Sequence, residues 1–101
     1  MGISIVMAVN HVIVTRHQAL VALLRERGLI GDEAVVIEHA SPDTVRGKDV
    51  IGVLPLSLAA IANTITEIPL ALTPSDRGIE LTLERIREIA GQPVTYKVTK
   101  V

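Results

Sequence analysis

The segment Val12-Ile13-Val14-Thr15-Arg16-His17-Gln18-Ala19-Leu20 decides how the fold is interpreted. Its β-branched apolar residues predict a buried strand over residues 11–15, and an amphipathic pattern predicts a helix over residues 17–27 that begins at once. In an open α/β sheet, such a junction is the carboxyl end of a strand, where ligands usually bind. A hydroxyl, a guanidinium and an imidazole are therefore expected together at that edge of the sheet.

The remaining sequence continues to alternate between strand and helix patterns. Strands are predicted over residues 34–38, 50–54, 65–72 and 94–99, and helices over residues 57–63 and 82–90, with Ser57 and Thr82 as N-caps. The unbroken apolar run of the third strand is typical of a central strand covered on both faces, and the alternation in the last strand indicates one wet face. The order of these elements and their short connections predict an α/β three-layer sandwich with a mostly parallel five-stranded sheet.

Composition limits the domain count and the classes of partner. The chain has 101 residues, 49% of them hydrophobic, which predicts one folded domain, assigned to residues 11–101. Tyr96 is the only aromatic residue and the net charge is −1, so extended DNA or RNA is not an expected partner. The absence of cysteine excludes disulfides and fits a reducing compartment, so a cytoplasmic location is expected.

The first ten residues form an apolar segment of their own. Residues 1–10 lack the basic start of a signal peptide, and Asn10 and His11 end the apolar run too early for a membrane span. We expect an N-terminal strand or apolar arm there, and no membrane as a partner.

Thr15-Arg16-His17 has two readings of equal weight. At a strand end and helix N-terminus, backbone N–H groups favour an anion, Arg16 can bind phosphate oxygens and His17 can move a proton near neutral pH. The alternative is a capped helix start with two exposed polar residues.

Two further segments lie at predicted strand ends or in loops. Gly52-Val53-Leu54-Pro55-Leu56-Ser57 feeds a helix, and its glycine would let a ligand approach closely, although a packing glycine followed by an ordinary N-cap is the favoured alternative. The Arg77-Gly78 pair, in a loop between a strand and a helix, could close over an anion. The favoured alternative is a solvated turn in which Arg77 pairs with Asp76 or Glu80.

Metal and cofactor sites are not predicted. His11, His17 and His39 are far apart in the chain, and no carboxylate stands at a ligand spacing from them. His39 follows a strand and could also lie at the carboxyl edge. Neither a phosphate-binding Gly-Lys-Ser/Thr loop nor a dinucleotide fingerprint is present.

Three motifs in this order resemble a known family. Val14-Thr15-Arg16-His17, Gly52-Val53-Leu54-Pro55 and Arg77-Gly78-Ile79-Glu80-Leu81 are similar to motifs of the small CRISPR-associated type III accessory proteins, in the roughly hundred-residue group counted among the ring nucleases. The resemblance spans residues 11–101. It implies a Rossmann-like fold, a homodimer, and a cyclic oligoadenylate ligand, with cyclic tetra-adenylate expected. It also implies cleavage of that messenger to linear products, which switches off antiviral signalling.

The implied chemistry gives each candidate residue a role. Ring opening by attack of a ribose 2′-OH needs no metal, so Arg16 is expected to stabilise the phosphate and His17 to act as general acid or base. The ligand-binding residues are expected to be Thr15, Gly52, Pro55, Leu56, Ser57, Arg77 and Gly78. Two alternatives stay open: a module that only binds or sequesters the cyclic nucleotide, and a structural or protein-interaction domain that joins a partner through an exposed apolar arm at residues 1–9.

Overall fold

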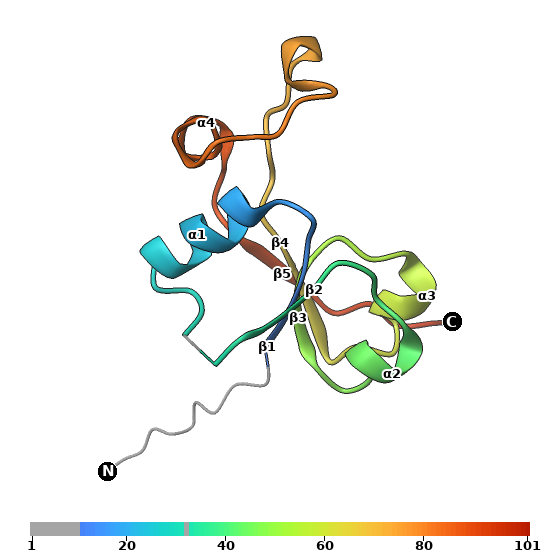
Figure 1. Ribbon diagram of the computed structural model, residues 1–101. Coiled ribbons are helices and arrows are strands. Elements are labelled where there is room, and N and C mark those ends of the chain that lie inside the picture. Colours follow the sequence, from blue (N-terminus) through green and yellow to red (C-terminus); the bar gives the residue numbers. More distant parts are fainter. Residues whose placement is uncertain (1–10, 32) are drawn as a thin grey trace.

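The computed structural model describes residues 11–31 and 33–101, and within them five strands alternate with helices (Figure 1). The predicted arm over residues 1–10 lies outside the described residues. In chain order the elements are β1 His11–Val14, α1 Gln18–Glu26, β2 Val35–Ile37, α2 Pro42–Val45, β3 Asp49–Gly52, α3 Leu56–Ala59, β4 Thr64–Glu67, the 3₁₀ turn η2 Pro74–Asp76, α4 Leu83–Ile89 and β5 Val94–Tyr96.

The sheet has the order β2-β1-β3-β4-β5. The first four strands in this order are parallel, and β5 pairs antiparallel with β4. Because β1 lies between β2 and β3, the chain builds the sheet in one direction and then in the other, which is the doubly wound arrangement of Rossmann-like folds. The predicted mostly parallel five-stranded sheet is confirmed.

Helices cover both faces of the sheet. Ile13 and Ile51 project to one face, where they pack with buried residues of α1 and α4. Val50 and Ile65 project to the other face, where they pack with α2 and α3. Successive strand residues point to opposite faces, so β3 contributes to both cores, as expected for a central strand. Figure 1 shows the two helix layers on either side of the sheet, and the predicted three-layer sandwich is confirmed.

Helix α1 follows its sequence pattern closely. Its buried residues are Leu20, Val21, Leu23 and Leu24, which lie on one face. His17 is the N-cap rather than the first helical residue, and Gly28, with φ of 71°, follows the C-cap as predicted. The left-handed conformation there favours glycine because it has no Cβ.

The helix predicted over residues 57–63 begins and ends earlier. Pro55 is the N-cap of α3, and its carbonyl oxygen accepts from the N–H groups of Leu58 and Ala59 at 3.0 and 2.9 Å. The prediction of Ser57 as N-cap is therefore wrong, because this residue is already the second residue of the helix.

The predicted strands over residues 65–72 and 94–99 are both shorter in the structure. Strand β4 ends at Glu67, before Pro69, which cannot donate to a ladder. Strand β5 covers three residues and all are exposed, including Tyr96 at 47%. The predicted single wet face is thus wrong.

Between β2 and β3, where no helix is predicted above, the chain forms the short helix α2. Ser41 and Thr44 form a capping box around Pro42, and Val45, the last residue of α2, is fully buried. Serine followed by proline is a helix start signal, because proline suits the first helical position.

Charged residues fasten α4 to its neighbours. Arg87 Nε donates to Glu26 Oε2 at 2.9 Å, and Arg27 Nη1 donates to the carbonyl oxygen of Gly91 at 3.0 Å. These contacts join α1 and α4, which pack side by side over the sheet. Charged residues at the surface of α1 and α4 therefore hold the two helices together.

Membrane-spanning length is not reached by any helix in the part of the chain that the structure describes.

Candidate functional site

The carboxyl ends of the four parallel strands form one edge of the sheet. At its centre β1 and β3 are neighbours, with Val14 opposite Gly52, and from there the chain departs to α1 on one face and to α3 on the other. Such a switch point leaves a crevice outside the strand ends, and ligands of open α/β sheets bind there. The structure therefore brings two of the three predicted motifs to the same point of the sheet.

Gly52 has a packing role at this point. Its φ is 144°, and a Cβ at this position would lie 2.2 Å from the carbonyl oxygen of Val14. Only a residue without a side chain allows β1 and β3 to approach this closely. The interpretation of Gly52 as a packing glycine is supported, and a direct contact with a ligand stays a prediction.

Thr15, Arg16 and His17 form the turn between β1 and α1. The backbone N–H of His17 donates to Thr15 Oγ1 at 3.0 Å, which fixes the turn. The His17 carbonyl oxygen accepts the first helical bond, from Leu20 at 3.0 Å, while its side chain makes no cap bond. The imidazole of His17 and the guanidinium of Arg16 are exposed and belong to neither core.

The end of β2 contacts this turn through Ile37 and, two residues later, through His39. The N–H of Thr15 donates to the carbonyl oxygen of Ile37 at 3.1 Å, which extends the β1–β2 pairing beyond the strands. His39 is two residues after Ile37, and its Nδ1 lies 3.5 Å from Arg16 Nη2. The sequence interpretation placed His39 at the carboxyl edge only as a weak candidate, and the parallel register is what brings it to Arg16.

The segment after β3 presents apolar side chains to solvent. Val53 and Leu56 are each 75% exposed, and Pro55 and Ser57 are also exposed. These apolar side chains follow the switch point directly, in the connection from β3 to α3, so an apolar surface adjoins the carboxyl edge there. Ser57 Oγ, which is not used as a cap, is free to donate to a ligand from this segment.

The third predicted motif lies in the connection from β4 to α4, which projects beyond the carboxyl ends of the strands (Figure 1). Asp76 is the anchor of this connection. It accepts from Thr73 N and Oγ1 at 2.8 and 3.0 Å, and from Arg85 Nε and Nη2, both at 2.9 Å. These bonds, that from Arg85 foremost, hold the pKa of Asp76 well below its usual range, and its side chain is only 6% exposed.

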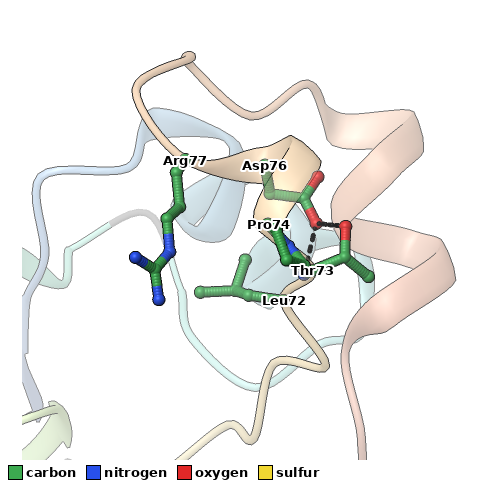
Figure 2. Close-up of a pocket in the computed structure, with 5 residues that line it drawn as sticks. All are labelled: Leu72, Thr73, Pro74, Asp76 and Arg77. Carbon is green, nitrogen blue, oxygen red and sulfur yellow. Dashed lines mark hydrogen bonds between the residues drawn. The ribbon is translucent and has the colours of Figure 1, made fainter.

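This anchoring leaves Arg77 without its expected partner. Because Arg85 and Thr73 occupy Asp76, the predicted pairing of Arg77 with Asp76 or Glu80 is wrong, and among the described residues its guanidinium has no ion-pair or hydrogen-bond partner. Figure 2 shows the Arg77 side chain extending past Leu72, away from the Asp76 carboxylate. These three residues line a pocket of about 240 Å³ together with Thr73 and Pro74. Gly78 follows with φ of 74° and lets the chain turn back toward α4.

The structure thus brings some of the predicted residues together directly and others only to the same edge. Thr15 and His17 are hydrogen-bonded, and Val14 and Gly52 are in contact. Arg77 lies in the β4–α4 connection, which projects beyond the strand ends (Figure 1), and among the described residues no hydrogen bond joins it to the Thr15-Arg16-His17 turn. In residues 11–31 and 33–101, no three His, Cys, Asp or Glu side chains gather in a way that could hold a metal ion.

Fold and site together define a small doubly wound α/β protein whose switch point exposes an arginine and two histidines. The comparisons with known proteins identify the family. A sequence model of the family described as "Putative CRISPR-associated protein (Cas_VVA1548)" matches residues 12–99, and the chain belongs to this CRISPR-associated family. No curated protein and no solved structure matches the chain. The CRISPR association expected from the three motifs is confirmed, and membership of the ring nucleases stays a prediction.

Proposed function

We propose that this protein is a ring nuclease that binds a cyclic oligoadenylate, with cyclic tetra-adenylate as the expected substrate, and cleaves it to linear products in the cytoplasm. The observation that carries the proposal is the pair Arg16 and His17, exposed side by side at the switch point of the sheet in a CRISPR-associated protein. Cleavage of this second messenger would switch off the antiviral effectors that it activates.

The features of the edge suit a phosphate ligand. Helix α1 directs its N-terminus to this edge, and the positive end of a helix favours an anion. Arg16 adds a guanidinium that can bind two phosphate oxygens, and Arg77 adds a second cation from the projecting connection. Thr15 Oγ1 accepts the N–H of His17, so its own proton is free to be donated to a phosphate oxygen.

The proposed reaction breaks one phosphodiester bond without a cofactor. A ribose 2′-oxygen attacks the adjacent phosphorus in line, the bond to the 5′-oxygen breaks, and the products carry a 2′,3′-cyclic phosphate and a 5′-hydroxyl. Arg16 stabilises the charge that develops on the phosphorane oxygens, and His17 carries a proton to or from one reacting oxygen. Ser57 and Arg77 hold the ribose and phosphate in line for the attack.

A homodimer is the assembly that this substrate favours. A ring of four adenylates can have twofold symmetry, and a C2 dimer would offer each half of the ring the same residues. Two copies of Arg16 and Arg77 would then face four phosphates although the chain has a net charge of −1. Light scattering on the purified protein, with and without the ligand, tests for the dimer.

The decisive experiment incubates the purified protein with labelled cyclic tetra-adenylate, with and without EDTA, and resolves the products. Linear products that form equally in EDTA support the proposal. Tight binding with an intact ring would replace it with the sequestering module, and neither binding nor cleavage would overturn both.

Two substitutions then test the assigned roles. His17→Ala is expected to slow cleavage by about 100-fold or more with little change in affinity, because it removes proton transfer rather than a phosphate contact. Arg16→Ala is expected to reduce both. Equal losses of affinity and rate in His17→Ala would remove this residue from the acid–base role.

A further inference from the structure

The reaction proposed above needs two proton transfers, and His17 can perform only one of them in a given turnover. The 2′-hydroxyl loses a proton as its oxygen bonds to phosphorus, and the departing 5′-oxygen gains one on the opposite side of the phosphorus. Efficient cleavage therefore requires a second group that exchanges protons near neutral pH.

His39 is placed to be that group. Strands β1 and β2 run parallel with Val14 opposite Ile37, so Arg16 and His39 each lie two residues beyond the end of their strand. The bond from Thr15 N to the Ile37 carbonyl oxygen holds the two chain segments together at this point. As a result, His39 Nδ1 lies 3.5 Å from Arg16 Nη2. The guanidinium of Arg16, proposed to bind phosphate, thus has two imidazoles near it. His39 is beside it in space, and His17 follows it in sequence.

The contact also leaves one nitrogen of His39 available. A guanidinium has only donors, so in the free protein Arg16 faces an unprotonated Nδ1, and the neutral imidazole carries its proton on Nε2. When Arg16 turns to the phosphate, Nδ1 is released, and the imidazole can then take up or give up a proton. His39 is exposed, as a residue that meets a substrate must be before binding. Asp76, in the β4–α4 connection, is unsuitable as an alternative because four hydrogen bonds from Thr73 and Arg85 occupy its carboxylate.

We propose that His39 is a second catalytic residue, which works as the proton-transfer partner of His17 on the phosphate held by Arg16. This inference rests on the proposed ring nuclease activity. One imidazole takes the proton of the 2′-hydroxyl while the O2′–P bond forms, and the other gives its proton to the 5′-oxygen as the P–O5′ bond breaks. The two imidazoles exchange protons with water before the next turnover.

The test compares single-turnover cleavage of cyclic tetra-adenylate by four variants. His39→Ala is expected to lower the rate by about 100-fold or more, as His17→Ala does, with a much smaller change in affinity. His11→Ala is the matched histidine control, because His11 begins β1 at the other edge of the sheet, and Glu38→Gln is the matched carboxylate control, because Glu38 precedes His39. Both controls are expected to cleave at the rate of the unchanged protein, and circular dichroism verifies that every variant is folded.

A second substrate separates proton transfer from a structural effect. When sulfur replaces the bridging 5′-oxygen, the thiolate departs without a proton, so a variant that lacks only the general acid recovers its rate. One of the two histidine variants is expected to recover and the other is not, which identifies the acid and the base.

Several results would overturn the inference while the proposed function stands. In these cases the unchanged protein cleaves, but His39→Ala cleaves equally fast, loses affinity as much as rate, or responds to the sulfur substrate in the same way as His17→Ala. Failure of the unchanged protein to cleave would instead overturn the proposed function, and this inference with it.

Discussion

The two edges of the sheet differ in how their polar side chains are satisfied. At the amino edge, Asp49 accepts from Asn63 Nδ2 at 2.6 Å and from Thr64 Oγ1 at 2.8 Å, and Lys97 Nζ donates to the Asn63 carbonyl oxygen at 2.9 Å. At the carboxyl edge, the one partner of Arg16 among the described residues is a histidine. Among the described residues, Arg77 has no partner at all.

This difference separates stability from function. Polar groups that satisfy one another stabilise the fold and leave nothing for a ligand, whereas cations without an acidic partner are suited to bind one. The amino edge therefore belongs to the scaffold, and the carboxyl edge is the surface where we expect chemistry.

The largest expected effect is a loss of stability at Gly52, a candidate site residue that also packs the sheet. Gly52, the last residue of β3, lies at the carboxyl edge and is buried against Val14 of β1. Gly52→Ala is expected to destabilise the fold by about 3 kcal/mol or more, because the new Cβ overlaps the Val14 carbonyl oxygen and the backbone conformation becomes strained. Thermal unfolding measures the loss.

Gly47 provides the control for that substitution. Its φ is 70° and a Cβ there would meet nothing within 4 Å, so Gly47→Ala tests the backbone strain without the overlap and should cost only about 1 kcal/mol. If the two variants unfold at the same temperature, close packing does not explain Gly52.

The second effect concerns affinity at the carboxyl edge. Arg16→Ala is expected to weaken binding of cyclic tetra-adenylate by about ten- to a hundredfold, since it removes a charge-assisted contact to phosphate. Titration calorimetry measures the change. Arg25→Ala is the control, because Arg25 is an exposed arginine in the last turn of α1, at the far end of that helix; an equal loss in this variant would show that only the overall charge matters.

The third effect concerns stability at the amino edge. Asp49→Ala is expected to destabilise the fold by about 1 kcal/mol, through loss of two hydrogen bonds at a partly exposed position, and to leave ligand affinity unchanged. Asp43→Ala should change neither quantity, because Asp43 is 92% exposed in its pair with Arg46. Weaker ligand binding by Asp49→Ala would contradict the division between the two edges.

The smallest effect is a loss of stability in acid. The hydrogen bond from Asn63 is the main cause that lowers the pKa of Asp49, and hydrogen bonds from Arg85 foremost lower that of Asp76. Groups with a lowered pKa stabilise the folded state above their ordinary pKa of about 3.9, and this contribution is lost as the pH falls further. Urea unfolding at pH 7, 5 and 3 should give nearly equal stability at the first two values and a decrease at the third, and constant stability to pH 3 would refute the role of these bonds.

Sequence patterns predicted the architecture well because it depends on burial. The apolar run over residues 50–54 and the helical spacing of Leu20, Leu23 and Leu24 reflect one requirement, that these residues leave water. The ends of elements were predicted less well, as at Glu67 and Ser57, because they depend on single backbone hydrogen bonds and on where proline interrupts them.

The candidate site was predictable only in part. The position of Arg16 and His17 at a strand end follows from the local pattern, since strand and helix adjoin there. The contact between Arg16 and His39 depends on the register of two parallel strands, and the pairing of Asp76 with Arg85 rather than Arg77 depends on how a connection folds back onto α4. Neither relation has a signature in residues close together in the chain.

The position of β1 has a consequence for synthesis. Strand β1 is synthesised before the other four strands, yet it is central in the sheet. Its two neighbours, β2 and β3, are synthesised later, and β3 ends only at Gly52. Until then its apolar residues and free N–H and C=O groups can pair with other chains. The interval between translation of β1 and β3 is therefore when a nascent chain is most exposed to aggregation, and expression at low temperature or with chaperones should protect it there.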